Sequence, residues 1–151
     1  MFETISLAPL SATGLAVAFF CGFIVGLERQ WIGKPAGIRT SILICMAVYT
    51  FVSIAYVMVE EEYAVRIIGA VVTGVGFLGA GVIIGRDGLV AGVTSAAIIW
   101  ILAATGCLIA FQYTTAAITL AIICVAVLIG ISFLERFFRK LKRGVHKDHS
   151  P

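Results

Sequence analysis

The sequence predicts an all-α, polytopic membrane protein built as a bundle of five transmembrane helices. Of its 151 residues, 61% are hydrophobic and 13% are charged, whereas a soluble domain carries about 25% charged residues. The mean hydropathy is +1.11. The apolar residues also form five runs, each close to the 20 or so residues that an α-helix needs to cross the hydrocarbon core of a bilayer.

The five predicted spans cover residues 5–27, 42–59, 67–84, 89–111 and 116–134, and none of them contains Asp, Glu, Lys, Arg or His. Lys and Arg are concentrated in alternate connections. If the amino terminus lies outside, Arg66 is the only cation of the eleven that faces outward. Because positive charge favours the cytoplasmic side, we expect the amino terminus outside and the carboxyl terminus in the cytoplasm.

The first span carries a ridge of small residues. Gly14, Ala18, Gly22 and Gly26 recur at every fourth position, so they lie along one side of a helix. Small residues let two membrane helices approach closely. We therefore predict that Gly22 and Gly26 pack against another helix, the alternative being small residues of no special role.

The connection between the first two spans is rich in charge and includes Pro35 and Gly37, which favour a reversal of the chain. A second turn, between spans three and four, emerges on the same side. Together these turns form a candidate cytoplasmic mouth that binds a ligand or partner, the alternative being a purely structural network of ion pairs. Its residues are Glu28, Arg29, Lys34, Arg39, Arg86 and Asp87. We expect Glu28 to pair with Arg39 or Arg86, and Asp87 with Arg29 or Arg39.

The third span is rich in glycine, and Gly74, Gly76, Gly79 and Gly81 are predicted to allow close packing at the bundle centre. The alternative is a broken or deformable helix of the kind that transporters use near the midplane. The GxGxxG pattern at 74–79 does not indicate a dinucleotide site, because no βαβ unit surrounds it.

The remaining polar segments are expected to be structural rather than catalytic. Residues 135–151 form a basic, amphipathic tail that we expect to lie on the inner leaflet. The acidic residues 60–62 indicate a solvated turn or a first helical turn, with a weak outer Mg²⁺ site as the alternative. The four cysteines fall inside apolar runs and are expected to be packing residues.

Two segments resemble signatures of the MgtC/SapB family of bacterial inner-membrane proteins. They are GFIVGLERQWIGKPAGIRT at 22–40 and VVTGVGFLGAGVIIGRDGLVAGVTSAAIIW at 71–100, and the likeness covers roughly residues 7–134. The resemblance implies a multi-pass protein of the bacterial inner membrane that is linked to Mg²⁺ homeostasis. Since only seventeen residues follow Leu134, it also implies the short, SapB-like form without the carboxy-terminal ACT-like domain of many members.

The expected function is non-enzymatic. Both histidines lie in the tail, so no Ser–His or Cys–His set is available, and HExxH and P-loop motifs are absent from the sequence. The resemblance implies adaptation to Mg²⁺ limitation or membrane stress through contacts with other membrane components, as some members bind other membrane proteins such as ATP synthase. The expected partners are the lipid bilayer, other inner-membrane proteins or a second copy, and not nucleic acid.

The alternative function is a transporter or channel for Mg²⁺ or a small solute. No cofactor is expected, with loosely held Mg²⁺ as the alternative. Because ion-coupled transporters place ionisable groups at membrane depth and the predicted spans hold none, the sequence favours the contact role.

Overall fold

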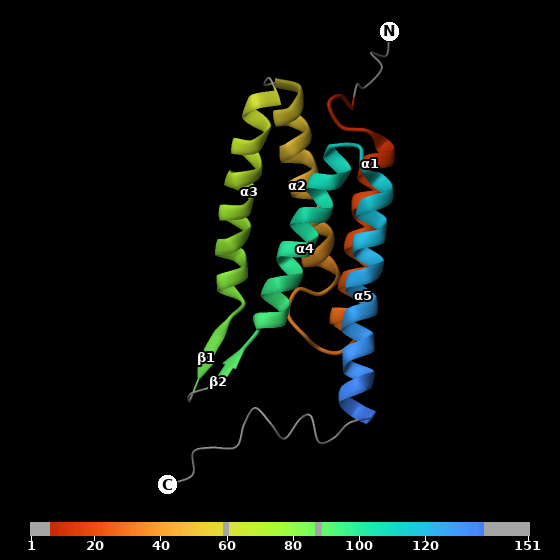
Figure 1. Ribbon diagram of the computed structural model, residues 1–151, viewed down its shortest axis with the longest axis vertical. Helices are drawn as coiled ribbons and strands as arrows, with labels where there is room; N and C mark the ends of the chain where they lie inside the picture. Colours follow the sequence, from red (N-terminus) through yellow and green to blue (C-terminus); the bar gives the residue numbers. More distant parts are fainter. Residues whose placement is uncertain (1–6, 59–60, 87–88, 138–151) are drawn as a thin grey trace.

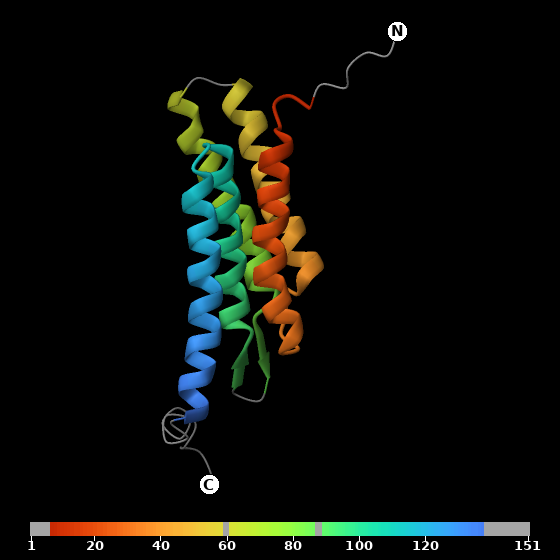
Figure 2. The ribbon, with the colours of Figure 1, turned by 90° about the vertical axis from the view of Figure 1, so that its right-hand side faces the viewer.

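The computed structural model describes residues 7–58, 61–86 and 89–137, and in these ranges the fold is all-α apart from one short hairpin (Figure 1). The elements, in order, are α1 (Ala12–Trp31), α2 (Ile38–Met58), α3 (Glu61–Gly81), β1 (Ile84–Arg86), β2 (Leu89–Ala91), α4 (Val93–Ala110) and α5 (Thr114–Phe137). The helices run alternately up and down, so consecutive helices are antiparallel (Figures 1 and 2). The predicted all-α, membrane-like bundle of five helices is confirmed.

Four of the described helices are long and apolar enough to cross a membrane, judged by length and composition: Ala12–Trp31, Ile38–Tyr56, Val93–Ala110 and Thr114–Leu134. The apolar part of α3, Arg66–Gly81, is shorter. Large apolar side chains such as Phe20 and Phe51 point outward, as expected where lipid rather than water surrounds the helices. The side of the membrane on which each end lies stays a prediction.

Helix ends differ from the predicted spans where local hydrogen bonding decides them. The first helix begins at Ala12 because Ser11 caps it, its Oγ accepting from the backbone N–H of Gly14 at 2.9 Å. Residues 84 and 89–91, which we expected inside spans three and four, pair as antiparallel strands, with Ile84 opposite Ala91. The predicted tail at 135–151 lies outside the described residues from position 138 onward.

The closest helix packing joins α1, α2 and α4. A Cβ at Gly22 would stand 2.6 Å from Ile42 Cα, and one at Gly26 would stand 2.6 Å from Ile38 Cα, so the two backbones meet with nothing between them. A little further along α2, a Cβ at Gly106 of α4 would stand 2.8 Å from the carbonyl oxygen of Cys45. These three glycines let α2 approach both α1 and α4 closely.

The helix at the edge of the bundle is α3, which packs mainly on α4 (Figure 1). A Cβ at Gly74 or Gly81 would meet no other described atom within 4 Å, while one at Gly76 or Gly79 would make ordinary contacts with α4 at 3.6–3.9 Å. The expected close packing at the bundle centre is therefore wrong for Gly74 and Gly81. The helix is also continuous from Glu61 to Gly81, unlike the broken helix that we considered as the alternative.

Candidate functional site

The candidate site lies at one end of the bundle, where α1 ends, the 32–37 loop turns back, the β1–β2 hairpin projects and α5 ends (Figures 1 and 2). We call this the hairpin end. The loop is closed by backbone bonds, since Lys34 N–H donates to the carbonyl oxygen of Arg29 at 2.9 Å. Gly33 and Ala36 take positive φ angles of 65° and 63° within it. The turn brings the backbone of Lys34 against the end of α1, while the Lys34 side chain stays exposed.

Glu28 and Arg29, neighbours in the last turns of α1, form a buried ion pair. Arg29 Nε donates to Glu28 Oε2, and Arg29 Nη2 donates to Glu28 Oε1 at 2.8 Å. The side chain of Arg29 is only 4% exposed, and that of Glu28 is 9% exposed. Two charges withdrawn from solvent this far are stable only as a pair with good geometry, and the fork of two parallel bonds provides it.

The ion pair formed by Glu28 was not among those that we predicted. Glu28 pairs with Arg29, which we had assigned to Asp87, and not with Arg39, which is exposed. Arg39 instead lines a shallow polar hollow with Gln30 and Lys34. Asp87 and the side chain of Arg86 lie outside the described part of the chain, so the pairs predicted for them stay predictions.

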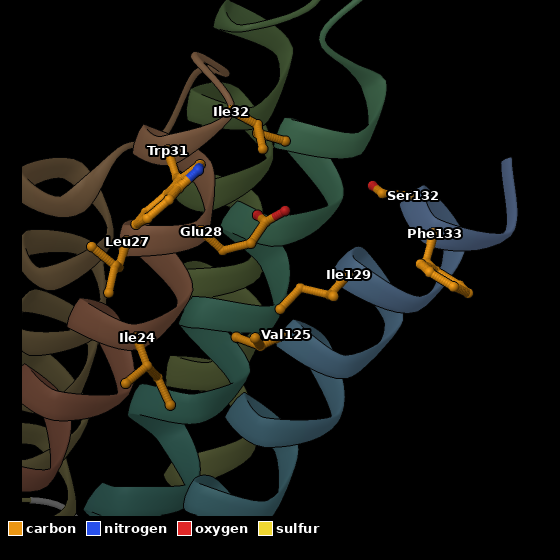
Figure 3. A pocket seen from close by; sticks show the side chains of 9 residues that line it. All are labelled: Ile24, Leu27, Glu28, Trp31, Ile32, Val125, Ile129, Ser132 and Phe133. Carbon is orange, nitrogen blue, oxygen red and sulfur yellow. The ribbon is translucent and has the colours of Figure 1, made fainter. Parts of the chain in front are cut away.

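On one side of the ion pair, a groove of about 510 Å³ runs between α1 and α5 (Figure 3). Its wall is mostly apolar and includes Ile24, Leu27, Val125 and Ile129. Figure 3 shows the Glu28 carboxylate among these side chains. We call this the α1–α5 groove, and it presents one acidic group inside an apolar channel on the flank of the bundle.

On the other side of the ion pair lies a more polar pocket of about 590 Å³, which we call the hairpin pocket. Arg29 and Lys34 reach it from the end of α1 and the loop, while Thr94 and Ser95 reach it from the first turn of α4. The ends of α3 and α5 and the hairpin supply its apolar walls. Arg29 therefore lies between the two cavities, bonded to Glu28 on the groove side.

Several residues of these cavities were missing from the predicted site. Trp31 flanks the α1–α5 groove and is 85% exposed, and Ser132 of α5 lines both cavities. The sequence signal for Trp31 was its place three residues after Glu28, on the same helix face. Nothing in the sequence indicated Ser132, because its approach to α1 depends on how α5 packs.

The described residues include no group of three or more His, Cys, Asp or Glu placed to hold a metal ion. All four cysteines are free thiols, and Cys21 and Cys45 are buried. The side chains of Glu60, Glu61 and Glu62, for which we considered an outer Mg²⁺ site, lie outside the described part of the structure.

A family model described as the MgtC family matches residues 15–137. The chain belongs to the MgtC family. This match confirms the resemblance drawn from the two sequence segments, and it includes the ion pair and the residues of both cavities. No solved structure matches the chain.

The relatives of this MgtC-family chain include proteins of several bacteria. It is 38% identical to Protein MgtC of Brucella abortus over 66% of this chain and 43% of that protein. It is 45% identical to the "Putative magnesium transporter YhiD" of Escherichia coli over 63% of this chain and 47% of that protein. It is 36% identical to Protein MgtC of Salmonella typhimurium over 76% of this chain and 50% of that protein. The chain therefore spans half, or somewhat less, of the length of these relatives.

Proposed function

We propose that this chain is a non-enzymatic protein of the bacterial inner membrane that supports Mg²⁺ homeostasis by contacting other membrane components. The observation that carries the proposal is the α1–α5 groove. It is an open, apolar channel on the flank of the bundle, and the carboxylate of Glu28 lies within it. An apolar groove of this kind suits the side chains of another membrane helix, and the carboxylate adds a polar contact that would select its partner.

The interior of the bundle supports contact rather than transport. Mg²⁺ gives up its water reluctantly and prefers carboxylate ligands. Two buried hydroxyls of the interior are engaged by backbone: Ser41 Oγ donates to the carbonyl of Ala36 and Thr105 Oγ1 to that of Ile101, both at 2.8 Å. The close contacts at Gly22 and Gly106 leave little room between the central helices.

A Mg²⁺ transporter is the second candidate, favoured by the name of the Escherichia coli relative, "Putative magnesium transporter YhiD". The two candidates separate in one assay, in which the purified chain in liposomes is tested for Mg²⁺ flux with a fluorescent indicator inside. The contact role predicts the flux of protein-free liposomes. Flux that exceeds this level and falls in Glu28→Gln would establish transport instead.

A second experiment tests the groove itself. Ile129 and Ile122 lie on α5 and are each 56% exposed, but Ile129 lines the α1–α5 groove while Ile122 does not. A bulky side chain at the first position fills the groove, whereas at the second it meets lipid. The variants are expressed at equal levels in the source bacterium, in place of the wild-type chain, and growth is measured at low Mg²⁺. We expect Ile129→Trp to abolish the growth that depends on the chain, and Ile122→Trp to leave it unchanged. Equal growth of the two variants would contradict the proposal.

A further inference from the structure

The first turn of α4 has no cap. Its N-cap residue is Gly92, which has no side chain and takes a φ of 91°. The backbone N–H groups at the start of an α-helix have no acceptor within the helix. For Val93, Thr94 and Ser95, no other described residue supplies one. This end of α4 thus carries unsatisfied donors and the positive end of the helix dipole.

Ser95 adds a second, independent feature. The residue is 2% exposed and lines the hairpin pocket. Its hydroxyl makes no hydrogen bond with another described residue. Since no fully buried side-chain oxygen or nitrogen of the described residues lacks a partner, the Ser95 oxygen keeps some exposure, and it opens to the pocket. A ligand in the pocket would supply the missing partner.

Two cations line the hairpin pocket, and the charge of one of them, Arg29, is balanced by Glu28. Arg29 and Lys34 line it, and none of its described lining residues is Asp or Glu. Arg29 uses its Nε and Nη2 for Glu28, which leaves other N–H groups of its five donors free to bond elsewhere. A nearly fully buried guanidinium, a lysine and an uncapped helix start therefore meet in one cavity.

We propose that the hairpin pocket binds a phosphate group, held by the first turn of α4, the hydroxyl of Ser95 and the cations of Arg29 and Lys34. Helix N-termini bind phosphate through their free N–H groups and their dipole, and hydrogen bonds between charged partners are the strong ones. The two cavities share Ile32 and Ser132, but none of the proposed phosphate-binding residues lines the α1–α5 groove, so the proposal stands or falls independently of the proposed function.

The pocket also has room for more than a phosphate ion. Its walls continue along α5 as Val127, Leu128 and Ile131, which are apolar. The phosphate could thus belong to the headgroup of an anionic lipid, whose chains follow these walls, or be free in solution. Both sources present the same oxygens to the same donors, and the test treats them as separate arms.

The test uses the full chain in a maltoside detergent, which contains no phosphate. In the first arm, inorganic phosphate is titrated calorimetrically against chloride at constant ionic strength. In the second, protein extracted from vesicles that contain phosphatidylglycerol and diacylglycerol is examined by native mass spectrometry. We expect specific binding of inorganic phosphate in the first arm, or retention of phosphatidylglycerol but not of diacylglycerol in the second.

The site variant is Ser95→Ala with Lys34→Gln, which removes one unbonded hydroxyl and one exposed cation. Its matched control is Ser53→Ala with Arg66→Gln, because Ser53 is also buried and Arg66 also exposed, but neither lines the hairpin pocket. We expect the site variant to bind at least about tenfold more weakly, the usual effect of losing a hydrogen bond to a charged group. The control should bind like the wild type.

Three outcomes would overturn the proposal. They are no binding in either arm, unchanged binding in the site variant, and an equal loss in the control. Thermal unfolding of each variant checks that it is folded. If the double site variant is not, Lys34→Gln alone carries the test, since that side chain is exposed and its loss removes charge without removing packing.

Discussion

The contact between α1 and α2 at Gly22 gives a quantitative test of the fold. In Gly22→Ala, the new Cβ would stand 2.6 Å from Ile42 Cα and 2.8 Å from the carbonyl oxygen of Ser41. Carbon atoms pack at about 3.5–4.0 Å, and the opposing atoms belong to backbone, which cannot rotate away. The two helices must therefore separate by roughly 1 Å, the shortfall from that normal contact distance.

The cost of this separation follows from overpacking, which destabilises a well-packed interior by about 1–3 kcal/mol per insertion. We expect the upper part of that range, about 2–3 kcal/mol, because moving the helices also loosens the contact at Gly26. Gly74→Ala is the matched control, since its Cβ would meet no other described atom within 4 Å. Alanine favours a helix over glycine by about 1 kcal/mol, so this variant should be slightly stabilised.

The assay is reversible unfolding of the purified chain in mixed micelles of dodecyl maltoside and dodecyl sulfate, followed by far-ultraviolet circular dichroism. The free energies of unfolding of the two variants should differ by about 3–4 kcal/mol, with opposite signs relative to the wild type. Equal shifts, or a Gly22→Ala chain as stable as the wild type, would refute the close approach of α1 and α2.

Three further predictions follow from the hairpin end. Glu28→Gln should lower the free energy of unfolding by about 3 kcal/mol, because it leaves the buried charge of Arg29 unpaired. The double variant Glu28→Gln with Arg29→Gln should lose less stability, because no charge is then left unpaired. Additive losses in the same titration would show that the two residues are not coupled. Gly92→Ala should destabilise the chain by at least about 2 kcal/mol, since Gly92 has a φ of 91° and the new Cβ would overlap the carbonyl oxygen of Val82, just past α3. An unchanged midpoint of thermal unfolding would argue against the hairpin geometry. In a chain without its native cysteines, Lys34→Cys should react with an impermeant maleimide only after the cells are opened, and Arg66→Cys in intact cells; the reverse pattern would invert the predicted orientation.

The sequence determined the class of the protein and the nature of its elements. Long apolar runs without charge must satisfy their backbone groups internally in lipid, so they form helices where they cross the hydrocarbon core. The four-residue spacing on the first span likewise indicated a ridge that includes Gly22 and Gly26, and in the structure this ridge meets α2. Patterns along the chain report these features because they depend on one helix at a time.

The tertiary structure decided what lies opposite each face. Gly74 and Gly81 belong to a glycine-rich helix whose composition is typical of close packing. However, α3 lies at the edge of the bundle, and a Cβ at either glycine would meet no other described atom within 4 Å. Gly106 of α4, by contrast, packs tightly against α2. The pairing of Glu28 with Arg29 depends in the same way on which cations the fold brings near the end of α1. Periodicity shows which residues share a face, but contacts depend on helix order and rotation, which are set by the packing of the whole bundle.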